Sequence, residues 1–374
     1  MAFIVATATG LPTKYYSQEV LANLLRRYCL TMLLDFDLDT IERFFKNVMI
    51  KGRHFALPLE SFYDPPNIGT TTKAAITSAV NLSELTVRKL LERANLAPKD
   101  VSQITSVSLT VSIPSLDARL MNRIPFSANL KRTPLAGVGC MGGAIGLSRV
   151  ADYLRGHPKE AAILFAVELA SFLWQGSLQG DLYYMIKHLR EEPSLYSDII
   201  STIVTAALFG DGAAAVLMVG QDHPLAQAGR PQIINSQSIL IPNTEDLMGM
   251  DIVDTGMRNI LKPQVGEFIK VGLRQAIDGL LAEHNISIDQ INHWIVHPGG
   301  PKVIQAVEEE FGLDEHALDL SRETLAKVGN LSSPTVLYML DTILSDGKQP
   351  PPGTYGLLVG MGPGFSQEVI LLQW

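Results

Sequence analysis

Residues 134–154 read PLAGVGCMGGAIGLSRVADYL and pass from a turn of small residues directly into a helical pattern. Cys140 stands immediately before that helix, among glycines that allow unusual backbone angles and close approach of a substrate. We therefore predict that Cys140 lies at a helix N-terminus. The apolar side chains with the spacing of an amphipathic helix are Ile145, Val150, Tyr153 and Leu154.

The position of Cys140 points to a reactive thiol. Unpaired backbone N–H groups and the positive end of the helix dipole favour the thiolate, so we expect a lowered pKa and a nucleophile. The alternative is a small buried cysteine that packs a glycine-rich helix face, which is the commoner role of a lone cysteine. The other cysteine, Cys29, is far away in the sequence, so we expect neither a disulfide framework nor a zinc site.

Bulk composition limits the possible function classes. The chain has 374 residues, 47% of them hydrophobic, and a net charge of −8 without a concentrated basic run, which argues against nucleic-acid binding. The most apolar stretch, residues 199–220, contains Gly210, Asp211 and Gly212 near its centre and is predicted to be core rather than a membrane span. The first twelve residues lack the basic segment of a signal peptide, so we expect a cytoplasmic protein without stable membrane insertion.

Strand-like and helix-like segments alternate along the chain, as in layered α/β proteins. The polar stretch 221–231 contains Pro224, Gly229 and Pro231 and is the best candidate for a boundary. We therefore predict two halves, residues 1–222 and 223–374, with a similar order of elements. Strands are predicted at residues 1–10, 103–111, 161–167, 213–219, 232–241, 292–296, 355–359 and 368–372.

Two further segments place polar side chains where ligands collect. In NHWIVHPGGPKVI (residues 292–304) an apolar strand ends at His297, which can donate a hydrogen bond to an oxyanion or exchange a proton. A structural histidine before a turn is an equal alternative. In KVGNLSSPTVLYML (residues 327–340) Asn330 precedes a helix that begins near Ser333. Its amide can cap that helix or donate an N–H to a substrate carbonyl, and the sequence alone favours the cap.

Five segments together resemble the signatures of the chalcone synthase or type III polyketide synthase family. They are GVGCMGGA (137–144), LFGDGAAA (208–215), HPGGP (297–301), GNLSSPTV (329–336) and GMGPGFS (360–366). The resemblance implies a five-layered αβαβα thiolase-like fold of two similar halves, a homodimer, and a triad of Cys140, His297 and Asn330. It also implies a gatekeeper phenylalanine at Phe209 and a cyclisation pocket shaped by the last segment, which contains Gly362.

The implied reaction needs neither a metal nor a bound cofactor, because loss of the malonyl carboxylate generates the carbanion. Cys140 would take an acyl starter from an acyl-CoA or an acyl-carrier protein. Malonyl-CoA would then enter, and His297 and Asn330 would stabilise the enolate that attacks the Cys140-bound acyl group. Repeated condensation and ring closure would complete the product.

Departures from the plant pattern bear on the substrate. The segment between Glu168 and Phe209 is longer than in plant members, with an insertion around residues 174–200 and an extra helix expected near 182–190. Asn259 stands where a second gatekeeper phenylalanine is expected, which favours a differently shaped cavity. Because DTGMRNIL and PSLDARLMNR resemble bacterial alkylresorcinol and alkylpyrone synthases, we expect a medium- or long-chain fatty acyl starter.

Ring closure and CoA recognition are assigned from single residues. Glu168, Ser332 and Thr110 match a family hydrogen-bond network linked to aldol closure, which favours an alkylresorcinol slightly over an alkylpyrone. A buried Glu168 that only caps a loop is an equal alternative. The cations that can meet CoA phosphates are Lys46, Lys51, Arg53 and Lys302, although scattered cations are more often solvated surface.

Two other classes of function remain open. A β-ketoacyl carrier-protein synthase III would share the fold and the triad but perform one condensation, and its usual ending differs from GMGPGFS. A non-catalytic interaction protein on the same fold would have no chemical need for all three triad residues.

Overall fold

The core of the protein is one mixed sheet of nine strands in the order β11-β12-β13-β8-β1-β7-β6-β4-β5. The computed structural model describes residues 1–374 except 64–65, 111, 255, 263 and 346–348. The strands β6 and β7 are buried along their whole length, so apart from Glu168 and Asp211 their sequences are small or apolar rather than alternating. The nine strands are β1 (Ala2–Gly10), β4 (Gln103–Val107), β5 (Lys131–Leu135), β6 (Ala161–Leu169), β7 (Asp211–Gly220), β8 (Gln232–Leu240), β11 (Ile291–Val296), β12 (Tyr355–Gly362) and β13 (Ser366–Gln373).

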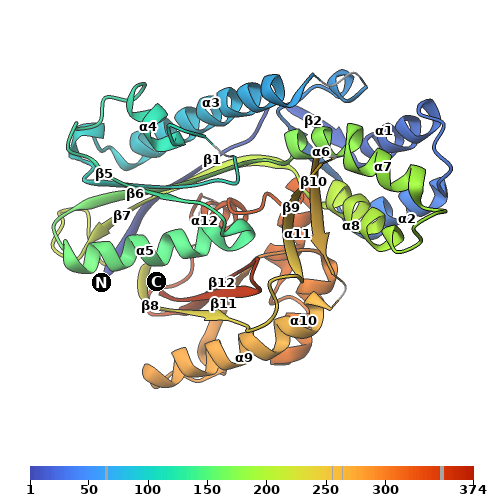
Figure 1. Ribbon diagram of the computed structural model, residues 1–374. Coiled ribbons are helices and arrows are strands. Elements are labelled where there is room, and N and C mark those ends of the chain that lie inside the picture. Colours follow the sequence, from blue (N-terminus) through green and yellow to red (C-terminus); the bar gives the residue numbers. More distant parts are fainter. Residues whose placement is uncertain (64–65, 111, 255, 263, 346–348) are drawn as a thin grey trace.

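The sheet divides into two halves at β1. This strand pairs with β7 along its length but with β8 only at Ala2↔Ile233 and Phe3↔Gln232. Two helices lie between the half-sheets, and other helices cover their outer faces (Figure 1). The inner helices are α5 (Gly142–Gly156) and α12 (Thr335–Ser345), and the outer ones are α3 (Ile68–Ala94) on one side and α9 (Val265–Glu283) and α10 (Pro301–Phe311) on the other. These layers confirm the predicted five-layered fold.

The inner layer explains the apolar sequence of α12. A helix at the centre of a protein is apolar on nearly all sides, and most side chains of TVLYMLDTILS are buried together with those of α5. Each such Leu or Val stabilises the fold by about 1.5–3 kcal/mol. The carboxylate of Asp341 is satisfied in this environment, because Thr7, Thr9 and Arg93 donate hydrogen bonds to it.

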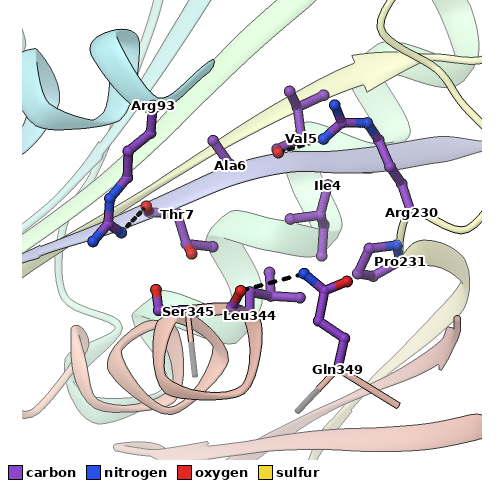
Figure 2. Close-up of a pocket in the computed structure, with 10 residues that line it drawn as sticks. All are labelled: Ile4, Val5, Ala6, Thr7, Arg93, Arg230, Pro231, Leu344, Ser345 and Gln349. Atoms are coloured by element: carbon purple, nitrogen blue, oxygen red, sulfur yellow. Dashed lines mark hydrogen bonds between the residues drawn. The ribbon is translucent and has the colours of Figure 1, made fainter. Parts of the chain in front are cut away.

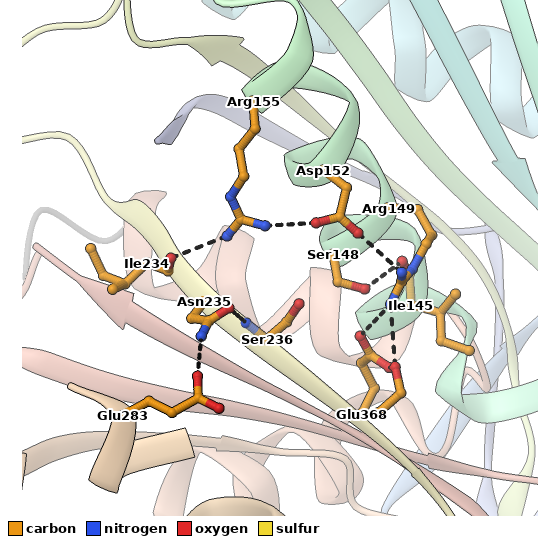
Figure 3. A network of polar contacts seen from close by, with 11 residues as sticks. Ile145, Ser148, Arg149, Asp152, Arg155, Ile234, Asn235, Ser236, Glu283 and Glu368 are labelled. Atoms are coloured by element: carbon orange, nitrogen blue, oxygen red, sulfur yellow. Dashed lines mark hydrogen bonds and ion pairs between the residues drawn. The ribbon is translucent and has the colours of Figure 1, made fainter. Parts of the chain in front are cut away.

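The helix α5, which follows Cys140, is fastened to the opposite half of the sheet (Figure 3). Arg155 donates to the carbonyl of Ile234 in β8 at 3.1 Å, and Arg149 lies 3.4 Å from the fully buried Glu368 of β13. Asp152 bridges the two arginines. The nucleophile helix therefore has a fixed position relative to the C-terminal strands.

A surface cavity of about 360 Å³ marks the place where the half-sheets part (Figure 2). The register of β1 shifts between Ile4 and Ala6, and Arg230 and Arg93 donate to the carbonyls of Val5 and Thr7 there. Backbone acceptors on an open strand edge need such partners. The cavity also contacts the C-terminal end of α12, the end away from Asn330.

A helical cap lies beside the layered core and packs against the hairpin of β9 (Met248–Val253) and β10 (Gly256–Leu261) (Figure 1). Its helices are α1 (Gln18–Thr31), α2 (Leu38–Asn47), α6 (Ala170–Gln179), α7 (Asp181–His188) and α8 (Leu195–Leu208). The extra helix predicted near residues 182–190 is α7. Its buried Asp181 accepts two hydrogen bonds from Arg258 of β10, at 2.9 and 2.8 Å, so an ion pair connects α7 with the hairpin. The remaining elements are β2 (Lys14–Ser17), β3 (Gly52–Phe55), α4 (Leu116–Met121) and α11 (Asp319–Val328).

Two segments refine the sequence expectations. The strand predicted at residues 103–111 ends at Val107, and Val111 lies outside the described residues. The apolar stretch 199–220 forms the end of α8 and all of β7, and no helix in the described part of the chain is long and apolar enough to span a membrane. The polar stretch 221–231 connects β7 with β8.

Candidate active site

Cys140 lies in a short 3₁₀ turn, Gly139–Met141, that leads directly into α5. Two of the surrounding glycines are required by packing. Gly139 has φ +52, and a Cβ there would lie 2.6 Å from Pro363. A Cβ on Gly143 would lie 2.3 Å from the carbonyl oxygen of Ser333, so this glycine lets the loop after Asn330 approach the turn. The predicted position of Cys140 before a helix is therefore confirmed.

The Cys140 thiol is buried and has polar neighbours from the C-terminal half. It donates a hydrogen bond to Ser332 Oγ at 3.4 Å, and the side chain of Asn330 also contacts it. Burial raises the pKa of the thiol to about 11, and the charge of Glu168 acts in the same direction. The predicted lowering of this pKa is wrong, because removal of water from the thiol outweighs the effect of the helix terminus.

Asn330 is held by its backbone against the end of α8. Its N–H donates to the Leu208 carbonyl at 2.9 Å, and its carbonyl accepts from the N–H of Gly210 at 3.0 Å. Its side-chain oxygen accepts from the Ser332 N–H at 2.7 Å, which leaves the amide NH₂ group for the sulfur of Cys140. The oxygen of the Asn330 amide therefore stabilises the local turn, while its NH₂ group can act as a hydrogen-bond donor.

His297 follows the end of β11 and is 2% exposed. Its N–H donates to the carbonyl of Val359 in β12, and the next residue, Gly360, packs against Met141. The end of β12 thus brings His297 and the Cys140 turn into one region. Neither ring nitrogen has a hydrogen-bond partner among the described residues, and burial lowers the ring's pKa to about 4, which favours the neutral form.

Glu168 occupies a different place in the hydrogen-bond network from the one predicted. Its two oxygens accept from Ser333 Oγ at 2.6 Å and from the Leu109 N–H at 2.9 Å. The predicted partners Ser332 and Thr110 are each one residue away. Ser332 has φ +60, and its hydroxyl contacts Cys140 instead, while the Thr110 N–H donates to a neighbouring serine. Burial raises the pKa of Glu168 to about 7.

Three of the predicted substrate-binding residues, Phe209, Asn259 and Gly362, lie on three different elements. Phe209 is the C-cap residue of α8, is half-buried and forms an isolated parallel β-bridge with Asn330. Asn259 lies in β10 opposite Met250, and its carbonyl accepts from Ser201 of α8 at 3.2 Å. Gly362 ends β12, and a Cβ there would lie 2.8 Å from the Met141 side chain.

The four predicted CoA cations separate into two groups. Lys46, Lys51 and Lys302 are exposed, as phosphate contact requires. Arg53 is completely buried, and its Nη1 donates to the carbonyls of Ala206 at 2.7 Å and Phe209 at 2.6 Å. The assignment of Arg53 to CoA phosphates is therefore wrong, because the last turn of α8 covers the guanidinium.

Comparisons with known proteins agree with this geometry. Residues 232–374 match the model described as chalcone and stilbene synthases, C-terminal domain, and residues 23–180 match FAE1/type III polyketide synthase-like protein. The chain is 38% identical to a 1,3,6,8-tetrahydroxynaphthalene synthase of Streptomyces peucetius subsp. caesius, over 99% of this chain and 93% of that protein. It is 33% identical to a putative chalcone synthase of Bacillus subtilis (strain 168), over 100% and 99%.

A solved structure shows the same architecture. The 1,3,6,8-tetrahydroxynaphthalene synthase from Streptomyces coelicolor A3(2), described as a bacterial type III polyketide synthase, superposes with a TM-score of 0.86. The two chains are 27% identical, and the superposition covers 100% of this chain and 99% of the other.

Proposed function

The chain belongs to the type III polyketide synthase family, acyltransferases that carry out decarboxylative Claisen condensation with malonyl-CoA, and we propose that Cys140, His297 and Asn330 are its catalytic residues. The observation that carries this proposal is the buried imidazole of His297, which has no hydrogen-bond partner among the described residues and lies in the region where the Asn330 amide faces the Cys140 thiol. Buried polar atoms without partners are costly, so such a group is expected where a ligand supplies the missing bond.

Loading begins with loss of the thiol proton. Burial disfavours the charged forms of Cys140 and His297 separately, but a proton passed from the thiol to the ring gives opposite charges in one buried site, and their attraction offsets the desolvation. The thiolate then attacks the starter thioester carbonyl. The carbon–sulfur bond to CoA breaks, and the departing CoA thiolate takes the proton from His297.

Extension uses His297 and Asn330 as hydrogen-bond donors. The malonyl thioester oxygen accepts from a ring N–H of His297 and from the Asn330 amide, so negative charge that develops on this oxygen is stabilised as carbon dioxide leaves. The resulting enolate attacks the acyl group on Cys140 and releases the cysteine thiolate, which leaves the extended chain on CoA. The thiolate then takes the chain back from this CoA thioester, and CoA leaves as in loading. Each cycle adds two carbons and one carbonyl to the chain.

The product class we propose is an aromatic ring with hydroxyl groups on alternate carbons. Condensation in two-carbon steps leaves oxygens on every second carbon, and the hydroxyl pattern named for the Streptomyces peucetius relative has this spacing. An alkylresorcinol carries the same pattern on a single ring. Ring closure by aldol condensation would give this class, whereas lactone formation would give an alkylpyrone.

Two starters are supported by different observations. A naphthalene skeleton divides into two-carbon units and leaves no side chain that would come from a different starter. The match over 99% of the chain to a tetrahydroxynaphthalene synthase therefore favours malonyl-CoA as both starter and extender. Asn259 on the hairpin beside α8, at a position where the resemblance places a phenylalanine, favours a fatty acyl starter. We propose malonyl-CoA first and the fatty acyl thioester, carried by CoA or by a carrier protein, as the second candidate.

The deciding experiment is incubation with malonyl-CoA alone and with malonyl-CoA plus acyl-CoAs of increasing chain length, with products identified by mass. Cys140→Ala should lose the covalent acyl adduct, while Cys29→Ala, a matched buried thiol, should keep it. An adduct that survives Cys140→Ala would refute the proposed nucleophile. A product from a single condensation would identify a synthase III type of activity instead.

Assembly and location are further parts of the proposal. Because homodimers are typical of the family, we expect a dimer in solution, which light scattering after size-exclusion chromatography measures. We also expect the enzyme in the cytoplasm, where its CoA substrates are made, and cell fractionation tests this.

A further inference from the structure

Arg53 is an unusual buried charge at the edge of the proposed catalytic centre. Its side chain is 0% exposed, and the guanidinium lies over the rings of Phe45 and Phe55. Only Nη1 has hydrogen-bond partners in the described part of the chain, whereas Nε and Nη2 have none. A buried and partly satisfied guanidinium is a poor contributor to stability, so stability alone does not explain this residue.

The partners of Nη1 connect Arg53 with Asn330. Nη1 donates to the carbonyls of Ala206 and Phe209, which fixes the last turn of α8. Leu208 in that turn accepts the backbone N–H of Asn330, and Gly210 after it donates to the Asn330 carbonyl. The guanidinium of Arg53 therefore fixes the same backbone segment to which the backbone of Asn330 is hydrogen-bonded.

Close packing adds a second link between Arg53 and Asn330. Gly329 has φ +72, and a Cβ there would lie 2.8 Å from Cγ and Cδ of Arg53. The stem of Arg53 thus lies directly against the residue before Asn330. A shorter or more flexible side chain would leave this backbone without its contact, and small displacements of a catalytic donor have large effects on rate.

Asp211 supplies the counter-charge. It begins β7 immediately after Phe209 and Gly210, is 0% exposed, and accepts from the N–H of Ala56 and from the N–H and hydroxyl of Ser171. Burial lowers the pKa of Arg53 to about 9, and the charge of Asp211 acts against this lowering. Asp211 thus ties the start of α6 to β7, and Arg53 ties the end of α8 to β3.

We propose that Arg53 is a positioning residue that sets the orientation of the Asn330 amide through the last turn of α8. This inference rests on the proposed role of Asn330 in decarboxylation. It assigns to Arg53 no contact with CoA or with the reacting atoms.

A double-mutant cycle tests the proposal. The variants are Arg53→Met, which keeps the volume of the stem, Asn330→Ala, and the two combined, each measured for release of carbon dioxide from malonyl-CoA and for acylation of Cys140. Asn330→Ala should slow decarboxylation by about 10²–10³-fold. Arg53→Met should slow it by about 10²-fold, as expected for a displaced catalytic group, with a much smaller effect on acylation.

The double variant distinguishes a role of Arg53 in positioning Asn330 from a general structural role. If Arg53 acts through Asn330, Arg53→Met should cost little in the Asn330→Ala background, because the group that it positions is gone. If the rate losses of the two single variants multiply in the double variant, the inference is overturned. Decarboxylation that is unchanged in Asn330→Ala would instead refute the proposed function, so the two failures are distinguishable.

Folding is controlled with two further variants. Arg53→Lys keeps the charge but replaces the fork of the guanidinium by a single ammonium, so it should show the same pattern in a milder form if Arg53→Met does not fold. Lys14→Met removes an exposed cation from β2, the strand paired with β3, and should change neither rate. Equal losses of acylation and decarboxylation in Arg53→Lys would also overturn the inference.

Discussion

Replacing Glu168 with glutamine should make the protein more stable at alkaline pH. The carboxyl is 4% exposed, and burial raises its pKa from 4.5 to about 7. A folded-state pKa above the unfolded one means that the folded protein binds the proton more tightly. The stabilisation is therefore fully present below the unfolded pKa and is lost as the pH rises through about 7. The shift corresponds to about 3 kcal/mol, at about 1.4 kcal/mol per pKa unit.

Glutamine can preserve both hydrogen bonds of the carboxylate. Its oxygen can accept the Leu109 N–H, and its NH₂ group can donate to Ser333 Oγ, because a hydroxyl is both donor and acceptor. The variant should therefore resemble the parent near pH 4 and exceed its free energy of unfolding by about 3 kcal/mol near pH 8.5.

Urea denaturation of both proteins at several pH values, followed by circular dichroism, measures the difference. Independent support would be infrared absorbance of protonated carboxyl groups near pH 6 that is weaker in the variant than in the parent. If the variant and the parent differ by the same free energy at every pH, Glu168 titrates as a solvated carboxyl and the reasoning from burial is refuted.

Three further perturbations test the site and its surroundings. His297→Ala should move the alkylation of Cys140 by iodoacetamide to higher pH, because the thiolate loses its proposed counter-charge; an unchanged profile would refute the ion pair. Asn259→Phe should lower the turnover of long acyl-CoAs relative to short ones, by a factor that corresponds to about 1–3 kcal/mol of overpacking, if long starters occupy the space beside Asn259. An unchanged ratio would remove the support for a fatty acyl starter. Arg258→Met removes the bidentate partner of buried Asp181 and should destabilise the fold by on the order of 3 kcal/mol, seen as a lower denaturation midpoint; an unchanged midpoint would contradict this.

The sequence predicted those features that depend on local pattern. Helical periodicity after Cys140 placed this residue at the start of α5, and the apolar run before His297 placed the histidine at the end of a strand. The layered fold followed from the alternation of strands and helices together with the family resemblance. These signals lie within a few residues of the positions that they describe.

Features that depend on distant contacts were missed. Arg53 has the charge of a surface residue, but α8, more than 150 residues later in the chain, buries it. The raised pKa of Cys140 likewise comes from burial by distant segments, which outweighs its own helix. Ser333 rather than the expected Ser332 contacts Glu168, because Ser332 adopts a left-handed backbone that the local sequence does not predict.

The proposed catalytic residues come from opposite sides of the β7–β8 connection. Cys140 precedes residues 221–231, whereas His297 and Asn330 follow them. The contacts between the halves include two residue pairs between β1 and β8 and the Phe209–Asn330 bridge. The architecture therefore lends itself to a split enzyme. If the chain were cut within residues 221–231 and produced as two fragments, neither would hold the full set of reacting groups, and condensation activity would report directly on their reassociation.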